Sequence, residues 1–198
     1  MSDSGKLIII SGPSGSGKST VVQHLLSACE LPLMLSISAT TRPIRSGEEN
    51  GKDYIFLNDE EFQHRRLSGD FLECKEVFGR GYWYGTIRNV VSTGLSGGKW
   101  VLLEIDVQGA LAVLREYPQA ITIFVHPGSM AELEKRLRNR GTESQASLQR
   151  RLDVAAEELA LRHHYTHEVI NDELNTTVQQ LCNLLMQYQG EKVPCSKN

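Results

Sequence analysis

The sequence lacks the features that mark membrane, secreted and nucleic-acid-binding proteins. No apolar run approaches the roughly 20 residues that a transmembrane helix needs, and residues 1–6 contain no apolar stretch typical of a signal peptide. The net charge of −3 gives no electrostatic reason to expect a nucleic-acid or membrane partner. We therefore expect a cytoplasmic protein whose partners are small molecules.

The cysteines are few and scattered, and none belongs to a C-x-x-C pair; they are Cys29, Cys74, Cys182 and Cys195. This spacing excludes a disulfide framework and the usual zinc-site patterns. Apolar residues make up 40% of the chain and charged residues 23%, which is ordinary for a globular protein. A chain of 198 residues suits one domain and can bury a full core without a metal or a disulfide.

One glycine-rich segment fits the pattern G-x-x-x-x-G-K-[ST] of a phosphate-binding P-loop. Its residues are Gly12, Pro13, Ser14, Gly15, Ser16, Gly17, Lys18 and Ser19. Glycines let successive backbone N–H groups turn inward and form an anion-binding nest. The lysine of such a loop places a positive charge on the β- and γ-phosphates, and the hydroxyl is a ligand for Mg²⁺. The segment predicts a site for a nucleoside triphosphate.

The residues on either side supply the context that a P-loop requires. Residues 7–10 are a short apolar run rich in β-branched residues, and residues 20–26 continue with apolar residues at helical spacing. With a strand before the loop and a helix after it, an accidental glycine- and serine-rich turn is the weaker interpretation.

Apolar strands alternate with helices along much of the chain. We expect strands at 33–38, 100–106, 121–125 and 168–170, and helices at about 108–116, 129–139, 144–163 and 173–188. The alternation favours an α/β protein with an open parallel sheet flanked by helices. Ligands of such sheets bind at the carboxyl ends of the strands, where the P-loop and Asp106 fall.

The region from residue 40 to residue 86 has a different texture. Residues 40–52 are polar, contain a proline and two glycines, and are expected to form a long loop. From 53 to 86, short β-like pieces accompany a helix that is expected to begin at Asn58 or Asp59, because both residue types are good N-caps. We interpret this region as a small mixed α+β insertion.

Two arginines follow the second expected strand, Arg42 and Arg45, close to the crevice where a second substrate would bind. If that substrate carries a phosphate, arginine binds it best, because the planar guanidinium donates two parallel hydrogen bonds. The hydroxyls of Tyr54 and Tyr84 can join the same phosphate. The alternative is a pair of solvated loop arginines without a ligand.

A second basic cluster runs from Lys135 to Arg140 and continues at Arg150 and Arg151. Phosphoryl transfer spreads negative charge over the transferring oxygens, and arginines that close over the site stabilise that charge. A hinged, arginine-rich lid also excludes water, which is a competing acceptor. The alternative is a salt-bridged solvent face, since several glutamates lie nearby in the sequence.

Two carboxylates bear on the identity of the acceptor base. Guanine presents N1–H and N2–H₂ as donors on one edge, and a carboxylate accepts from both, whereas adenine offers no such pair. Glu73 and Asp106 each end a β-like stretch and are the candidates. The hydroxyls of Ser38 and Thr86 can donate to the guanine O6 atom. These residue types alone do not establish the base.

Several strings in the sequence resemble the signature of the guanylate kinases. The most specific string is residues 38–56, which read S-A-T-T-R-P-I-R-S-G-E-E-N-G-K-D-Y-I-F. The shorter strings are Gly12–Thr20, Phe71–Glu73, Tyr84–Thr86, Ile105–Gly109, Arg138–Gly141 and Ile170–Asp172. Their order and rough spacing match that family from about residue 5 to residue 188, which is nearly the whole chain.

The resemblance implies a P-loop nucleoside monophosphate kinase fold and the reaction ATP + GMP ⇌ ADP + GDP with Mg²⁺, with dGMP as a further acceptor. It also implies one domain over residues 5–188, followed by a flexible tail at 189–198. Within that domain, the core would comprise 5–37, 91–129 and 153–188, the GMP-binding region 38–90, and a helical lid 130–152.

The family pattern implies a role for individual residues as well. The ATP site would comprise Gly12, Pro13, Ser14, Gly15, Ser16, Gly17, Lys18, Ser19, Thr20, Asn171 and Asp172. The GMP site would comprise Ser38, Arg42, Arg45, Glu48, Tyr54, Glu73, Tyr84, Thr86 and Asp106. The catalytic residues, around the transferring phosphoryl group, would be Lys18, Arg42, Arg136, Arg140 and Arg151. Mg²⁺ would be bound by Ser19, with Glu104 acting through water.

Three features depart from the family pattern. Glu104 stands where members often have aspartate, which leaves its role at the metal open. The turn at 78–84 is about two residues longer than usual, and we assign the phosphate contact to Tyr84 rather than Tyr82 because a Gly-Thr pair follows it. His163 and His167 are four residues apart and could share a helix face as a metal site, although surface histidines are the simpler interpretation.

Two rival functions stay open at this point. A guanylate-kinase-like binding module of a scaffolding protein shares the signature but tends to have a degraded P-loop, whereas this loop is intact. A kinase for another phosphorylated acceptor is the nearer rival. Glu73 argues against it, because a carboxylate suits guanine and should reject AMP and UMP. Neither kinase needs a general base, because the acceptor is already an anionic phosphate oxygen.

Overall fold

The protein folds around a parallel β-sheet. The computed structural model describes residues 5–77, 81–139 and 145–189. The strands of the core sheet all run parallel, in the order β2 (Leu33–Leu35), β7 (Trp100–Glu104), β1 (Leu7–Ser11), β8 (Ile121–His126) and β9 (His167–Ile170). Every residue of β1 and of β8 is buried, because helices cover both faces of these central strands.

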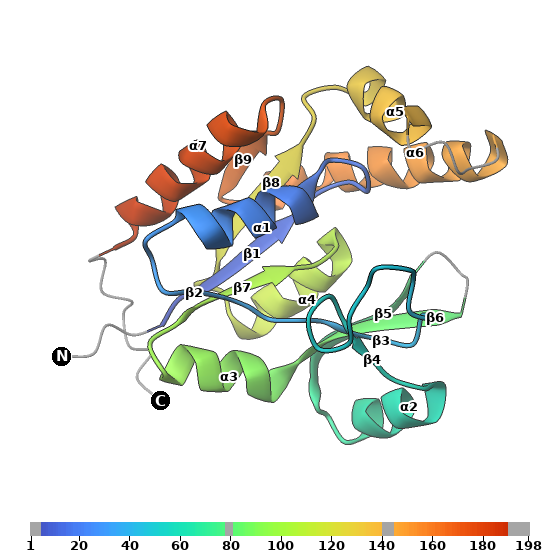
Figure 1. The fold of residues 1–198 in the computed structure, drawn as a ribbon, viewed down its shortest axis with the longest axis vertical. Helices are drawn as coiled ribbons and strands as arrows, with labels where there is room; N and C mark the ends of the chain where they lie inside the picture. Colours follow the sequence, from blue (N-terminus) through green and yellow to red (C-terminus); the bar gives the residue numbers. More distant parts are fainter. Residues whose placement is uncertain (1–4, 78–80, 140–144, 190–198) are drawn as a thin grey trace.

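The covering helices form the two outer layers (Figure 1). On one face, α1 (Lys18–Ala28) and α7 (Leu174–Gln187) pack on the sheet through a cluster that includes Leu25 and Leu181. On the other face, α3 (Arg88–Ser96) and α4 (Val107–Glu116) pack through a second cluster that includes Val91 and Val113. Successive residues of β1 enter opposite clusters, as the two-residue period of a strand requires.

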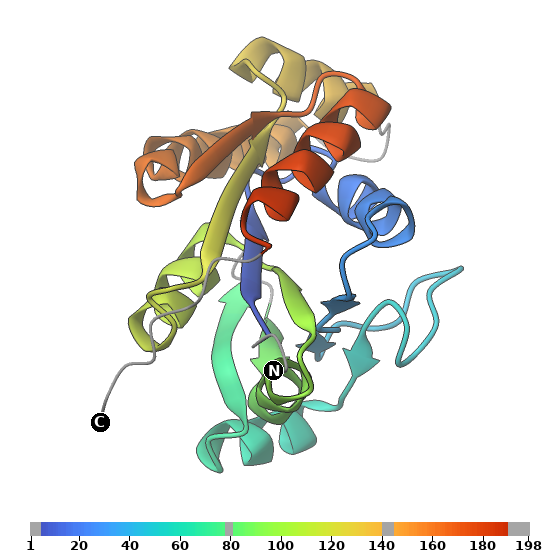
Figure 2. The same ribbon diagram turned by 90° about the vertical axis from the view of Figure 1, so that its left-hand side faces the viewer.

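A smaller mixed sheet lies beside the core. Its strands are ordered β4 (Ile55–Phe56), β3 (Ala39–Thr40), β6 (Tyr82–Ile87) and β5 (Phe71–Val77). Helix α2 (Asp59–Leu67) follows Asn58, whose side-chain oxygen accepts a hydrogen bond from the Glu61 N–H at 2.8 Å. The ring of Phe62 in α2 stacks on Phe71 of β5, and Figures 1 and 2 show α2 on the side of this sheet away from α7.

Two further helices, α5 (Met130–Asn139) and α6 (Gln145–Ala160), pack against each other at the end of the molecule opposite α2 (Figure 1). Their contact is a small apolar cluster of Leu133, Leu137, Leu148 and Ala155. A Cβ atom placed on Gly15 would lie 2.7 Å from Leu137, so this helix pair packs directly on the P-loop.

The structure confirms the predicted α/β fold and corrects three details of it. The strand expected at 33–38 ends at Leu35, because the chain leaves the core sheet there and enters the small sheet at Ala39. Thr40 belongs to β3 rather than to the long loop expected at 40–52. The helix expected at 144–163 ends at Ala160, and a 3₁₀ turn (Arg162–His164) follows it.

Helix α3 is an element that the sequence pattern did not predict. It contains Gly94 and β-branched residues, all of which have low helix propensity. Gly94 is required by packing, because a Cβ atom there would lie 2.4 Å from the Met34 side chain. Within the described ranges of the chain, no helix combines the length and the apolar character that crossing a membrane demands.

Candidate active site

The glycine-rich segment forms a tight loop between β1 and α1. Gly12, Gly15 and Gly17 have φ values of 142°, 96° and 86°, which side chains with a Cβ atom rarely allow. The Ser16 N–H donates to the Pro13 carbonyl at 3.1 Å and closes the turn. Gly17 is the N-cap of α1, so the positive end of the helix dipole lies at the loop.

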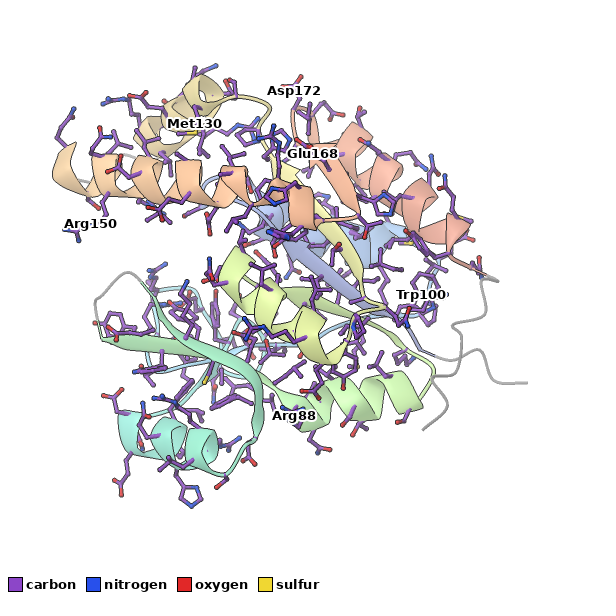
Figure 3. The ribbon with its side chains drawn as sticks, turned by 180° about the vertical axis from the view of Figure 1, so that it is seen from behind. Arg88, Trp100, Met130, Arg150, Glu168 and Asp172 are labelled. Atoms are coloured by element: carbon purple, nitrogen blue, oxygen red, sulfur yellow. The ribbon has the colours of Figure 1, made fainter. Side chains whose placement is uncertain are left out.

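Space also requires glycine at two of these positions. A Cβ atom on Gly12 would lie 2.0 Å from a backbone carbonyl oxygen of β8, and one on Gly17 would lie 2.6 Å from the Asn171 side-chain amide. That buried amide donates to the Ser16 carbonyl at 2.8 Å. Asn171 thus braces the loop, whereas the next residue, Asp172, is exposed at the surface (Figure 3).

Lys18 and Ser19 open helix α1 and lie against the loop. The Lys18 ammonium donates to the carbonyl oxygens of Gly12 and Pro13 at 2.6 and 3.0 Å, so a positive charge sits over the loop. The Ser19 hydroxyl donates to Oε1 of Glu104 at 2.6 Å. A hydroxyl beside a carboxylate is a donor set that fits Mg²⁺, which takes one or two protein oxygens and completes its shell with water and phosphate.

Helix α6 brings two charged side chains to the same loop. Nη2 of Arg151 donates to the Ser14 hydroxyl at 2.8 Å. The Glu158 carboxyl lies within hydrogen-bonding reach of the Ser14 backbone N–H and interacts with the Lys18 charge. Burial raises the pKa of Glu158 to about 7 against the opposing effect of Lys18. The loop is therefore contacted by both a cation and a titratable carboxyl of one helix.

The arginines of α5 are engaged within their own helix. Nε of Arg136 donates to Oε1 of Glu132 at 3.0 Å, and Arg138 contacts Glu134 at 2.6 Å with the same four-residue spacing. This face corresponds to the salt-bridged alternative considered for the basic cluster. Arg140 lies outside the described residues.

Arg42 is the centre of a second cluster, in the loop that follows β3 of the small sheet. Its side chain is only 7% exposed, and Nη1 and Nη2 donate to the two carboxylate oxygens of Glu48 at 3.0 and 2.8 Å. Nε donates to the Tyr84 hydroxyl at 3.1 Å. Hydrogen bonding to Glu48 raises the pKa of Arg42, and the same bonds lower the pKa of Glu48, so both groups stay charged.

Tyr54 and Arg45 lie at the edge of this cluster. The Tyr54 ring is 5.3 Å from the Arg42 guanidinium and 5.8 Å from the Tyr84 ring. Burial raises the pKa of Tyr54, so its hydroxyl keeps its proton and can donate it. Arg45 is exposed, and its backbone N–H rather than its guanidinium contacts Glu48, at 2.8 Å. The structure thus brings Tyr54 to Arg42 and leaves the Arg45 side chain at the surface.

Glu73 and Thr86 face each other across β5 and β6. The buried Thr86 hydroxyl donates to Oε1 of Glu73 at 2.7 Å. Oε2 of Glu73 lies 2.9 Å from where a Cβ atom on Gly109 would be, at the first turn of α4. Burial raises the pKa of Glu73 to about 7 despite the Thr86 hydrogen bond, and the nearby Asp106 contributes to the rise.

Asp106 is the N-cap of α4 and uses both carboxylate oxygens. Oδ1 accepts from the Gly109 N–H at 2.8 Å, and Oδ2 accepts from the Lys75 ammonium at 3.2 Å. Ser38 is half-buried beside β3, where its carbonyl accepts from the Ile55 N–H at 2.9 Å. In the part of the chain that the structure describes, no side-chain hydrogen bond joins Ser38 to the carboxylates.

Comparison with known proteins identifies the family of this chain. A family model described as guanylate kinase matches residues 4–188. The chain is 57% identical to the guanylate kinase of Rhodopirellula baltica, over 98% of this chain and 93% of that protein. It is 44% identical to the guanylate kinase of Rubrobacter xylanophilus, over 96% and 98%. The chain belongs to the guanylate kinase family.

A solved structure of the guanylate kinase family supports the same assignment. The crystal structure of guanylate kinase from Anaplasma phagocytophilum matches with a TM-score of 0.78 and 32% identity. The match covers 96% of this chain and 88% of that one. The resemblance carried by strings such as residues 38–56 is thereby confirmed at the level of family and fold.

Three residues near this guanylate kinase site were missed by the sequence analysis. Lys75 follows Glu73 by two residues, so strand periodicity could have placed both on one face. Glu158 follows Arg151 by seven residues, which is two helical turns. Gly109 stands three residues after the Asp106 cap. Each spacing becomes informative only when the partner across the site is known.

His163 and His167 do not share a helix face, so the alternative of a metal site there fails, and His163 is exposed as the simpler interpretation expects. His163 lies in the 3₁₀ turn and His167 in β9, so a change from helix to strand separates them. The His167 ring contacts the Tyr188 hydroxyl at 2.6 Å. Among residues 5–77, 81–139 and 145–189, no group of three or more His, Cys, Asp or Glu side chains is arranged to hold a metal ion.

Proposed function

We propose that this protein is a guanylate kinase that transfers the γ-phosphoryl group of ATP to GMP, giving ADP and GDP, and that it also accepts dGMP. The P-loop and Lys18 hold the triphosphate, and the small sheet holds the acceptor nucleotide. Family membership and the intact P-loop favour this catalytic role over that of a binding module.

The observation that carries the proposal is the arrangement of side chains on β6. Tyr84 and Thr86 are two residues apart and therefore lie on one face of the strand. Tyr84 contacts Arg42, whereas Thr86 contacts Glu73. One face thus presents a guanidinium for a phosphate and, next to it, a carboxylate for the N–H edge of guanine.

The transfer requires the protein to position the two nucleotides and to offset the negative charge of their phosphates. The attacking oxygen of GMP is already anionic, so no side chain has to remove a proton. Lys18 on the donor side and Arg42 on the acceptor side offset the repulsion between the two phosphates. Arg151, at the rim of the loop, is placed to stabilise the transferring oxygens. Because Glu48 and Tyr84 already hold Arg42, little side-chain freedom is lost when GMP binds.

Ser19 and Glu104 are the residues that would hold Mg²⁺ with ATP. When bound, the ion neutralises phosphate charge and orients the oxygens for in-line attack. The contact between the Ser19 hydroxyl and Glu104 fixes both oxygen atoms at the start of α1. In our proposal the serine is a direct ligand and the glutamate acts through a bound water.

We propose a core of residues 5–37, 91–129 and 153–188, a GMP-binding region at 38–90, a lid at 130–152 and a tail at 189–198. The lid carries Arg136, Arg140 and Arg151. Its boundary at residue 152 lies inside α6, which continues to Ala160. Movement of the lid therefore either bends α6 or carries Glu158 with it.

The proposed partners are the nucleotides themselves, without a nucleic acid or a membrane. The net charge of −3 fits this choice, since proteins that bind either polyanion by bulk charge are basic. We place the protein in the cytoplasm, with its soluble substrates.

A coupled assay of ADP release tests the proposed function with ATP, Mg²⁺ and, in turn, GMP, dGMP, AMP and UMP. We expect turnover with GMP and dGMP, and at least about 10²-fold lower kcat/KM with AMP and UMP, because Glu73 would be left unpaired. Background rates with GMP would contradict the proposal. Equal turnover of AMP would favour a kinase for another acceptor, and nucleotide binding without ADP release would favour a binding module.

A further inference from the structure

Lys75 is a charged residue of the small sheet to which the proposed reaction gives no role. It lies in β5, two residues after Glu73, and the pairing of β5 with β6 sets it directly opposite Tyr84. Glu73 is set opposite Thr86 in the same way. Since these four side chains share one face, Lys75 lies on the face proposed to bind GMP, across from Tyr84 and next to Glu73 along the strand.

The surroundings of Lys75 are rich in carboxylates from three different elements. Asp106 at the start of α4 accepts its hydrogen bond at 3.2 Å. Glu73 from β5 and Glu158 from α6 also interact with its charge. Lys18 of α1 is a further cation that interacts with Glu158. Carboxylates gathered in this way disfavour one another's ionised forms, and a cation among them offsets that repulsion.

Lys75 is also connected to the position of Glu73 through α4. Asp106 holds the Gly109 N–H with one carboxylate oxygen and Lys75 with the other. Glu73 packs against Gly109 on the same turn. A shift of Asp106 therefore moves the turn of α4 on which the Glu73 carboxyl, the proposed partner of guanine, packs.

We propose that Lys75 is a positioning residue of the GMP site, whose ammonium holds Asp106 and balances the negative charge of Glu73 and Glu158. The inference rests on the proposed function, because it takes Glu73 as the partner of guanine. An ionised carboxylate accepts from both N1–H and N2–H₂, whereas a protonated carboxyl carries a donor that faces these donors. The cation at position 75 keeps Glu73 in the form that guanine needs.

The loss of this cation should therefore matter most in acid. Burial raises the pKa of Glu73 to about 7 with Lys75 in place. Removing a nearby positive charge raises the pKa of a carboxyl further, so Glu73 takes up a proton at higher pH than before. A rise of about half a unit to one unit weakens GMP binding roughly 3- to 10-fold well below the pKa and hardly at all well above it.

The test compares the parent protein with Lys75→Met, Lys75→Arg and Lys99→Met, the last as a control for the loss of an exposed lysine away from the site. The dissociation constant of GMP is measured by calorimetry near pH 6 and near pH 8.5, and turnover is measured separately. The phosphate of GMP itself titrates near pH 6, so the readout is the ratio of variant to parent at each pH. Lys75→Gln serves as a second neutral variant if Lys75→Met does not fold.

We expect Lys75→Met to weaken GMP binding about 3- to 10-fold near pH 6 and less than about 2-fold near pH 8.5, with Lys75→Arg and Lys99→Met close to the parent. An equal loss at both pH values overturns the role of Lys75 in keeping Glu73 ionised, and no loss at either pH overturns any role of Lys75 in GMP binding. Failure of Lys75→Arg to restore binding also overturns it. If the expected pattern appears in a protein that releases no ADP, the role of Lys75 stands and the proposed function fails; a parent that binds no GMP contradicts both.

Discussion

The proposed site has a donor half for ATP and an acceptor half for GMP, and the two halves bind their nucleotides through different groups of the protein. The donor half is mostly backbone, supplied by one short segment with its glycines and by the Lys18 that follows directly. The acceptor half is mostly side chains, brought together from a loop and two strands: Arg42 and Glu48 of the loop with Tyr84 of β6, and Glu73 of β5 with Thr86 of β6. A site formed by the backbone can be predicted from one continuous sequence motif, whereas a site formed by side chains depends on how the strands are paired.

The two halves should also contribute differently to the reaction. Backbone N–H groups and a lysine recognise any triphosphate, so the donor half supplies binding and transition-state charge without choosing a base. In the acceptor half, Glu48 and Tyr84 fix Arg42, and Thr86 fixes Glu73, before any ligand is present. Changes in the donor half should therefore reduce turnover, and changes in the acceptor half should reduce GMP binding and selectivity.

The largest effect should come from the donor half. Lys18→Ala removes the charge over the loop, and we expect kcat/KM to fall by about 10³-fold or more, measured as ADP release. The side chain is half-buried and donates to two carbonyls of the loop, so the melting temperature should change by less than about 4 °C. Lys18→Arg, which keeps the charge but alters its shape, is the matched control. Near-normal turnover of Lys18→Ala would sink the role assigned to this loop.

Arg42→Ala should be the largest effect in the acceptor half. We expect the KM for GMP to rise about 10²-fold with the KM for ATP unchanged, since the loss of a charged hydrogen-bond donor to the phosphate costs about 2–3 kcal/mol. The unfolding free energy should also fall by about 1–3 kcal/mol, because the Glu48 carboxylate, 19% exposed, is left without its partner. The exposed Arg45→Ala is the control and should raise the KM for GMP less. Unchanged GMP affinity in Arg42→Ala would count against the acceptor site.

Glu73→Gln should lower the activity with GMP and, near pH 8, raise the stability of the fold. We expect kcat/KM for GMP to fall about 10²-fold, because an amide accepts from only one of the two guanine donors. Since the folded pKa of Glu73 is raised to about 7, its protonated form favours the fold and stability is lost as the pH rises toward 7 and above.

Glu73→Gln removes that loss, so the variant should melt higher than the parent near pH 8 by about 2–4 °C for each kcal/mol regained. The gain should be smaller near pH 5, where the parent carboxyl is protonated as well. Thermal melts at the two pH values check the sign. The same melting difference at both would contradict the raised pKa.

Gly109→Ala should give the smallest effect and sharpen the acceptor half further. A Cβ atom there meets Oε2 of Glu73 at 2.9 Å, so we expect the carboxyl to move and GMP binding to weaken roughly 3- to 10-fold, with ATP binding unchanged. The fold should not be weakened, because alanine favours a helix over glycine by as much as about 1 kcal/mol. Gln108→Ala, at the exposed neighbouring position, is the control. Equal GMP binding in both variants would show that Glu73 tolerates the change.

The core of the fold was predictable because its signals are local. Central strands such as β1 and β8 are buried on both faces and therefore read as continuous apolar runs. The start of α2 was predictable from Asn58, whose side chain makes the expected capping bond. Helix α3 was missed because its glycine serves packing against Met34, a neighbour that no local pattern reveals.

The candidate site, like the fold, was predictable where the signal is local and not where it depends on distant residues. Arg42 and Glu73 were singled out by residue type, yet what holds them in place is Tyr84 and Thr86 of a neighbouring strand, together with Glu48 of the same loop as Arg42. The alternative of a shared helix face for His163 and His167 failed because the chain turns from helix to strand between them. Lys75 stayed unnoticed because its partner, Asp106, is 31 residues away.

By itself, the sequence determined that a triphosphate site stands between a buried strand and a helix, because every requirement of that site lies within one short segment. It also determined the family, through short strings spread along nearly the whole chain. The tertiary structure alone decided which residues each charged side chain contacts: Glu73 contacts Thr86 and Gly109, Asp106 contacts Lys75, and Glu158 contacts the P-loop. Burial raises the pKa of Glu73 and of Glu158, and that burial depends on residues that are distant in the chain.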